Sequence, residues 1–233
     1  MIRAFEWNDF FFLLMAIRWT ALLSIIGIIG GGVLGLLIAL GRTSECRALR
    51  ILSALYIRVF QSTPLLMQLF LVYFGAGMLG LPVEPLSAAA IGLTLNAAAF
   101  LGEIWRGCIE AVPKGQGEAA NALALRGWQR ILLVILPQAV RIAIPPTVGF
   151  LVQLIKNTSL AAIIGFVELT RTGQIINNAT FRPFLVFSLV AVLYFALCWP
   201  LSRYSRKLEI KLAKGQPKSR GNAAESETRT LAA

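Results

Sequence analysis

An uncharged stretch near the start of the chain, residues 19–41, restricts the possible folds more than any other feature. A helix that crosses a bilayer needs about 20 apolar residues, and this stretch is long enough. Four further apolar runs follow it along the chain. We therefore predict an all-α fold, a polytopic membrane helical bundle with about five transmembrane helices, at residues 19–41, 59–81, 86–103, 142–167 and 183–201.

The composition agrees with a membrane protein. Apolar residues make up 57% of the 233 residues, charged residues make up 14%, and the mean hydropathy is +0.73. Soluble domains carry about 25% charged residues. Histidine is absent from the sequence, and the three cysteines, Cys46, Cys108 and Cys198, are widely spaced. We therefore predict neither a metal site nor a disulfide framework.

The positions of the basic residues predict an orientation. The net charge is +11, but the basic residues lie beside the apolar runs, which argues against a nucleic-acid partner and for a topology signal. The connections after the first and third spans and the tail are rich in Lys and Arg. We predict an external N-terminus and a cytoplasmic C-terminus, with a lead-in segment at 1–18, a transmembrane domain at 19–205 and a basic, partly disordered cytoplasmic tail at 206–233.

The first span contains Gly30, Gly31, Gly32 and Gly35. Small residues in a membrane helix allow the backbone of a neighbouring helix to approach closely. The same glycines are also compatible with a locally flexible helix, and the sequence does not separate these two interpretations.

Polar residues inside spans three and four are candidates for a translocation path, because an ionisable group at the bilayer centre costs about 2.5–3.5 kcal/mol on insertion scales. Lys156 either lines a path or extends to the boundary, and Asn157 and Ser159 continue a polar step beside it. Asn96 binds either a neighbouring helix or a substrate. Glu103 either contributes to the path or pairs with an arginine one turn later.

A polar, alanine-rich, helix-prone stretch begins at Lys114 and separates the third and fourth spans. Its sequence Glu118-Ala119-Ala120, followed at a distance by Leu136-Pro137, resembles the EAA loop of bacterial ABC-type import permeases. In that family the loop forms short cytoplasmic helices that dock onto a partner ATPase. The alternative for this stretch is an ordinary surface helix in a cytoplasmic loop.

Two positions depart from the EAA pattern, and one of them is a mild change: Val134 stands where the family has the isoleucine that precedes Leu-Pro by two residues. The family's glycine, six residues after the glutamate, is Ala124 here, so the sharpness of the bend is open, although Gly127 could supply the turn. The resemblance implies a coupling loop at about residues 108–137. Its ATPase-coupling residues would be Gly115, Glu118, Ala119, Ala120, Ala124, Gly127, Leu136 and Pro137.

Further motifs extend the resemblance in the same order over most of residues 19–205, among them Phe60-Gln61-Ser62-Thr63-Pro64-Leu65 and Lys156-Asn157-Thr158-Ser159-Leu160. Together they are similar to permeases of the polar amino-acid branch of ABC importers. That branch usually has Arg-Gly where Gln61-Ser62 stands, and Asp where Asn157 stands. With no carboxylate at 157 and a cation at 156, we expect neutral or acidic amino acids as substrates. The substrate-path candidates are Gln61, Asn96, Glu103, Lys156, Asn157 and Ser159.

The resemblance implies a multi-pass subunit of the bacterial inner membrane. Its implied partners are two ABC ATPase subunits that bind ATP and Mg²⁺, a second permease subunit (identical or related), an extracytoplasmic substrate-binding protein and an amino-acid substrate. The chain has no Gly-x4-Gly-Lys-Ser/Thr phosphate loop, so we expect a non-catalytic chain without a cofactor of its own.

Two alternatives belong to other functional classes. A secondary amino-acid transporter driven by an ion gradient would be expected to show internal repeats and acidic residues within its spans, and the sequence shows no convincing repeat and no clear buried acid. A membrane scaffold without transport activity would not need the polar step at Lys156.

Overall fold

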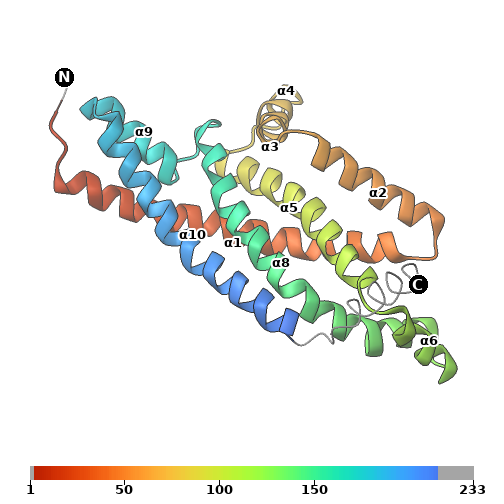
Figure 1. Ribbon diagram of the computed structural model, residues 1–233. Coiled ribbons are helices and arrows are strands. Elements are labelled where there is room, and N and C mark those ends of the chain that lie inside the picture. Colours follow the sequence, from red (N-terminus) through yellow and green to blue (C-terminus); the bar gives the residue numbers. More distant parts are fainter. Residues whose placement is uncertain (1–2, 215–233) are drawn as a thin grey trace, which may run out of the picture.

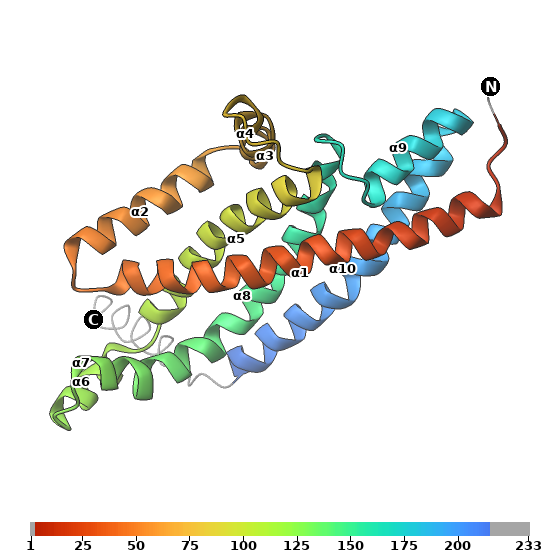
Figure 2. The same cartoon turned by 180° about the vertical axis from the view of Figure 1, so that it is seen from behind.

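The computed structural model describes residues 3–214, and this part of the chain consists of helices without any strand. Four long apolar helices lie side by side: α1 (Trp7–Thr43), α5 (Pro85–Glu110), α8 (Leu136–Asn157) and α10 (Pro183–Lys214). α1 starts and α10 ends at opposite ends of the bundle (Figures 1 and 2). The predicted all-α membrane bundle is confirmed.

α1 is a single helix from Trp7 onward, so the helical part of the predicted lead-in segment at residues 1–18 continues into the first span without a break. No proline interrupts residues 7–20. Arg18 does not end the helix either, since arginine is a good helix former. Its guanidinium lies over the ring of Trp19, 5.4 Å from the ring centre. A cation on an aromatic face keeps its charge at the surface of the helix without disturbing the backbone.

The glycines of α1 allow α5 to approach closely. A Cβ atom added at Gly31 would lie 2.5 Å from the Cβ of Ala97, and one at Gly35 would lie 3.1 Å from the carbonyl oxygen of Ala98. Neither position tolerates a side chain without a shift of one helix. The close-contact interpretation of these glycines is therefore confirmed, and α1 and α5 form the main helix pair of the bundle.

The second predicted span is not a straight helix. α2 (Arg47–Ser62) is followed by α3 (Leu65–Phe70), a π-helical turn at Leu71–Gly75 and α4 (Ala76–Met78), and the two halves meet at 104°. Pro64 causes the break, because it has no N–H group and forces the preceding Thr63 into an extended conformation. The predicted boundaries of 59–81 are thus wrong, and five spans are reached only if this bent pair counts as one.

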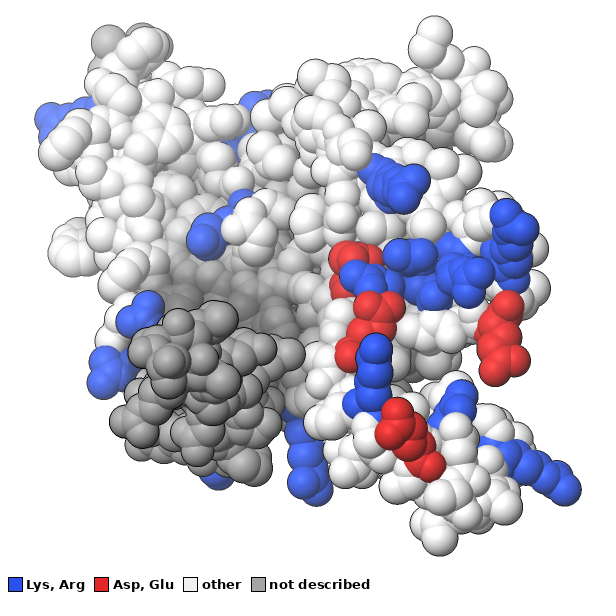
Figure 3. Space-filling model, turned by 45° about the vertical axis from the view of Figure 1, so that its right-hand side comes forward, with Lys and Arg blue, Asp and Glu red and all other residues white. Residues whose placement is uncertain are grey.

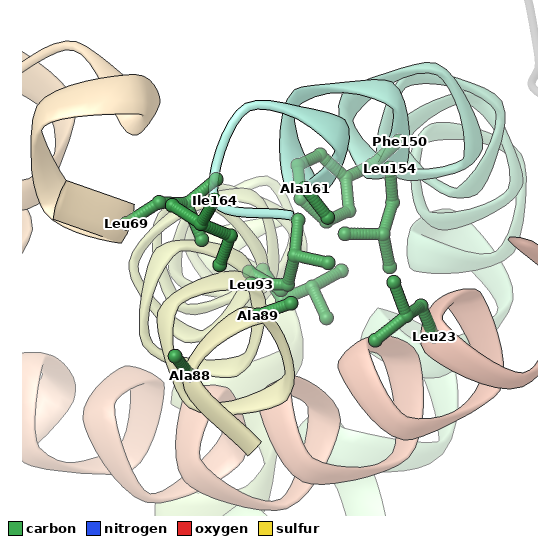
Figure 4. Packing of buried hydrophobic residues seen from close by; sticks show 11 residues of the cluster. Leu23, Leu69, Ala88, Ala89, Leu93, Phe150, Leu154, Ala161 and Ile164 are labelled. Atoms are coloured by element: carbon green, nitrogen blue, oxygen red, sulfur yellow. The ribbon is translucent and has the colours of Figure 1, made fainter. Parts of the chain in front are cut away.

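The core lies where α5 meets α1, α3 and the end of α8. Leu93 of α5 packs with Leu23, Leu69 and Leu154 in one cluster of buried apolar side chains, and Ile164 closes it near the connection after α8 (Figure 4). Four of these five side chains are fully buried, and Ile164 is 3% exposed. α5 therefore touches most of the bundle and orients the other helices.

The third, fourth and fifth spans differ from their predicted boundaries. α5 continues to Glu110 rather than ending at Glu103. α8 belongs to a helical run from Gly127 to Ala162, and a turn then leads to α9 (Leu169–Thr180).

α10 continues through residues 206–214, where the sequence predicted the start of a partly disordered tail. The helix continues because Arg203, Arg206 and Lys207 are helix formers in a charged, exposed stretch. The rest of the predicted tail, residues 215–233, lies outside the described residues.

Candidate functional site

The predicted coupling segment forms a short helix at one end of the bundle. α6 (Lys114–Ala122) follows Pro113, which is its N-cap residue with φ −55° and ψ 132°, and alanine-rich sequence favours helix in the residues that follow. α6 lies apart from the spans, at the end opposite α9 (Figures 1 and 2). We call these two ends the α6 end and the α9 end.

The turn after α6 is made by Ala124. Its φ of 54° lies in the left-handed region. The amide of Ala124 donates to the carbonyl of Asn121 (2.9 Å), and the amide of Leu125 donates to the carbonyl of Ala120 (3.1 Å). This hydrogen-bond pair is the Schellman motif, which usually has glycine at the left-handed position.

The suggestion that Gly127 supplies the turn is therefore wrong. Gly127 instead starts α7 (Gly127–Gln129), which continues as the π-helical segment Arg130–Ile135 into α8. The turn is made at Ala124 without glycine because the two Schellman hydrogen bonds form around it. Steric crowding of the Ala124 Cβ is the cost of that arrangement.

α6 turns one face to the bundle and leaves the other open. Ala120 is 2% exposed, whereas Glu118 and Ala119 are exposed. Two side-chain hydrogen bonds connect α6 to the next helix: Arg130 donates to Asn121 (3.1 Å), and the amide of Gln138 donates to Gln116 (3.2 Å). α6 is thus attached to the start of the long helical run and presents its acidic residue outward.

The remaining coupling candidates lie around this helix. Gly115 and Pro137 are exposed, and Leu136 is half-buried at the start of α8. Leu123 and Trp128 are apolar yet 75% and 58% exposed. Lys, Arg, Asp and Glu side chains gather at this end of the molecule (Figure 3). The exposed surface of the segment therefore combines charges with two large apolar side chains.

A second group of polar residues lies at the bend after α2. The Gln68 amide donates to the carbonyls of Phe60 (2.8 Å) and Thr63 (3.1 Å), which the break leaves without helical partners, and to the hydroxyl of Thr63 (2.9 Å). Asn96 of α5 donates to the Gln68 side-chain oxygen (3.0 Å). Gln68 and Asn96 are 8% and 3% exposed, so this contact fastens the bent pair to α5.

Sequence reasoning singled out Asn96 but missed Gln68. A lone glutamine in an apolar run gave no signal, although Pro64 four residues earlier marked a break whose carbonyls need donors. The nearby candidate Gln61 is exposed on the last turn of α2 and takes no part in this hydrogen-bond group.

The polar step in α8 remains together in space. Lys156 is exposed near the end of α8, and its backbone carbonyl accepts a hydrogen bond from Ser159 (2.7 Å). Half-buried Asn157 accepts one from the Gln153 amide (3.1 Å). These residues lie toward the α9 end of the long helical run, far along the chain from α6.

Glu103 lies elsewhere. Arg106 donates to Glu103 (Nε to Oε2, 2.9 Å) and also pairs with Glu110, so one guanidinium bridges two carboxylates along α5. Pairing of Glu103 with an arginine one turn later is therefore observed. The structure does not bring Glu103 to the polar step of α8.

Glu168 is a buried carboxylate that sequence reasoning placed in a short connection. Its side chain is fully buried and caps α9 by accepting from the amide of Arg171 (2.9 Å). Tyr194 of α10 donates to it (2.7 Å), and Thr20 of α1 lies 3.5 Å away. Burial raises the pKa of the Glu168 carboxyl, and the hydrogen bonds lower it to a smaller extent. Glu168 thus connects three helices at the α9 end.

Comparison with known proteins identifies the family of this chain. The family model for the binding-protein-dependent transport system inner membrane component matches residues 31–211. The chain is 38% identical to the probable amino-acid ABC transporter permease protein YckA of Bacillus subtilis, over 91% of this chain and 99% of that protein. It is 35% identical to the glutamine transport system permease protein GlnP of Escherichia coli, over 89% and 98%.

Solved structures agree with these relatives. A crystal structure of an amino acid ABC transporter with histidines has a TM-score of 0.83 and 29% identity, and it covers 90% of this chain and 100% of that chain. The MetNI methionine ABC transporter, at 19% identity and a TM-score of 0.66, shares the fold. None of these proteins is a transporter driven by an ion gradient. The chain belongs to the family of binding-protein-dependent transport system inner membrane components, which are multi-pass permease subunits of ABC importers.

Proposed function

We propose that this chain forms the translocation pathway of an ATP-driven importer of amino acids. The observation that carries the proposal is α6: a polar helix at one end of a membrane bundle, attached to a transmembrane helix and exposing Glu118. The names of the relatives support an amino-acid substrate, since those of YckA, GlnP and the L-cystine permease TcyB all state one.

The partners follow from the same proposal. Two ABC ATPase subunits bind ATP and Mg²⁺ and dock at α6, a second identical or related permease completes the pathway, and an extracytoplasmic binding protein delivers the substrate. The α6 end then faces the cytoplasm, with the N-terminus outside and the C-terminus inside. The Lys and Arg residues near the α6 end support this orientation by the positive-inside rule.

The helical run from Gly127 to Ala162 supplies a coupling mechanism. It contains 36 residues, which corresponds to about 54 Å at 1.5 Å per residue. One end is hydrogen-bonded to α6 through Arg130, and the other carries the polar step at Lys156. When ATP binding closes the ATPase pair, displacement of α6 tilts this helix and moves the polar step. The chain itself performs no chemistry.

The substrate class rests on charge. Lys156 is exposed, and Asn157 beside it is neutral and hydrogen-bonded to Gln153. A path that passes these residues has a neutral to positive local field, which favours neutral or acidic amino acids over cationic ones. Gln61, Asn96, Glu103 and Ser159 stay candidates for the same path.

The test is Glu118→Lys in the complete importer, with Glu45→Lys as the matched control. Both glutamates are exposed and lie toward the α6 end, in the connections after α5 and α1, so both changes alter the charge equally. We expect Glu118→Lys to lose co-purification of the ATPase or substrate uptake while the permease still inserts, and Glu45→Lys to retain both. Normal ATPase attachment and uptake in Glu118→Lys would refute the docking role of α6.

A further inference from the structure

Three adjoining hollows, which we call the cleft, lie between α1, α5 and the start of α8 at the α6 end. One of these hollows is a cavity of about 370 Å³ lined almost wholly by apolar side chains. Two further hollows adjoin it, since Ile109 lines all three and Leu136 lines two of them. The apolar lining includes Leu36, Trp105, Val140, Ala143, Ile144 and Val148.

The mouth of the cleft is basic. The two hollows that adjoin the cavity are lined by four basic residues: Arg42, Arg50, Lys114 and Arg130. Glu110 is the acidic residue among the same lining residues, and Arg106 already pairs with it. The mouth therefore carries an excess of positive charge next to the apolar cavity.

Arg42 has a hydrogen-bond donor that no protein group within residues 3–214 accepts. Its Nε atom is buried and has no hydrogen-bond partner among the described residues. A buried donor without an acceptor is costly, so we expect an acceptor from outside the described chain at this atom. The positive-inside rule explains why arginines occur at this end, but it does not explain a buried guanidinium nitrogen in a hollow that adjoins an apolar cavity.

We propose that the cleft binds an anionic phospholipid, namely phosphatidylglycerol, from the leaflet at the α6 end. An acyl chain occupies the apolar cavity beside Trp105 and Ala143, and the phosphate lies at Arg42 and Arg130. Basic pockets between transmembrane helices are suited to anionic headgroups, and an arginine can bind phosphate oxygens with two parallel hydrogen bonds. The site is independent of the transported substrate.

The first experiment measures lipid retention. The complete importer is purified and delipidated, and dioleoyl phosphatidylglycerol or dioleoyl phosphatidylcholine is added before native mass spectrometry. Because the acyl chains are identical, a difference reports on the headgroup. We expect the anionic lipid to be retained about tenfold more strongly than the neutral one. Equal retention of the two lipids would overturn the proposal.

Matched variants locate the site. Arg42→Gln with Arg130→Gln removes two charges, and each basic residue near an anionic surface contributes enough that we expect about thirtyfold weaker retention. Arg58→Gln with Arg203→Gln is the control, because these exposed arginines lie on α2 and α10, outside the cleft lining. Equal losses in the two double variants would indicate general charge attraction and refute a specific site.

A second measurement tests the acyl chain and does not depend on the arginine variants folding. Phosphatidylglycerol with brominated chains quenches nearby tryptophan fluorescence, and the difference between wild type and Trp105→Phe isolates the contribution of Trp105. We expect quenching of Trp105 in wild type and its loss in Ala143→Phe, which fills the cavity. An unquenched Trp105, or quenching that persists in Ala143→Phe, would place the chain elsewhere and overturn the proposal.

Discussion

Tyr194 of α10 donates a hydrogen bond of 2.7 Å to Glu168, a fully buried carboxylate that caps α9. Thr20 of α1 lies beside the same carboxylate at 3.5 Å. The fold thus places one titratable group among three helices at the α9 end, in a connection outside the spans. Because burial raises its pKa, this contact ties bundle stability to pH.

The first prediction follows from that pKa. Folded Glu168 retains its proton to a higher pH than the unfolded chain does, because burial dominates its shift. Between the two pKa values the folded state binds more protons, so stability falls as pH rises through this window. Glu168→Gln cannot titrate, and we expect it to lack this fall in melting temperature as the pH rises above the ordinary glutamate pKa of about 4.3.

The control is Glu84→Gln, which removes an exposed carboxylate and should leave the pH profile of the melting temperature as in wild type. A Glu168→Gln protein with the full wild-type pH dependence would show that another group is responsible.

The second prediction concerns Gln68 and Asn96, whose side chains meet at 3.0 Å. Gln68→Met leaves two backbone carbonyls and the Asn96 amide without partners, and Asn96→Ala removes the inter-helix bond alone. A double-mutant cycle should give a coupling of about 0.6–1.7 kcal/mol, the range of hydrogen bonds between membrane helices, measured by unfolding in mixed detergent. Gln61→Met, at an exposed site, should show no coupling to Asn96; additivity of Gln68→Met and Asn96→Ala would contradict the assignment.

The third prediction concerns Ala124 in the turn after α6. A left-handed alanine costs about 1 kcal/mol that glycine avoids, so Ala124→Gly should slow hydrogen exchange at the Leu125 amide about fivefold. Ala122→Gly is the matched change within regular helix and should have the opposite effect, since glycine is a poor helix former. Faster exchange in Ala124→Gly would mean that the turn is not strained.

The fourth prediction concerns orientation. Cys46 is exposed in the connection between α1 and α2, at the α6 end, and Glu84 precedes α5 at the opposite end. In intact cells a membrane-impermeant maleimide should not label a variant whose only cysteine is Cys46. The same reagent should label Glu84→Cys in a chain from which the other cysteines have been removed. A cysteine introduced at position 218 should also be spared until the membrane is opened. Labelling of Cys46 or of position 218 in sealed cells would overturn the cytoplasmic assignment of the α6 end.

The fifth prediction concerns substrate charge at Asn157. Two unit charges about 4 Å apart interact by about 4 kcal/mol at intermediate dielectric, before desolvation, so one carboxylate in the path can change selectivity. Wild type should take up glutamine or glutamate in preference to arginine, and Asn157→Asp should shift uptake toward arginine, with the binding protein held constant. A wild-type preference for arginine, or no shift in the variant, would refute the charge argument.

Several features of this protein follow from local sequence. The apolar runs predict the membrane helices because length and hydropathy are properties of a contiguous segment. The helix at Lys114–Ala122 and the pairing of Glu103 with Arg106 are also local, since they need only neighbouring turns of one helix. The glycines in the first apolar run were compatible with the close approach of another helix, but the sequence showed neither that a helix approaches nor which one.

Tertiary structure decided what depends on contacts between distant segments. The bend at Pro64 is held by Gln68, whose partner Asn96 lies on another helix. Glu168 looks like an ordinary loop glutamate until α1 and α10 close over it. Ala124 differs from these two cases, because the Schellman hydrogen bonds that hold its left-handed conformation join residues close in sequence, although the pattern of residues placed the turn at Gly127. Bending the chain at Pro64 and burying Glu168 both cost free energy, and groups on other helices offset that cost. Adjacent residues do not show which groups those are, so only the tertiary structure reveals them.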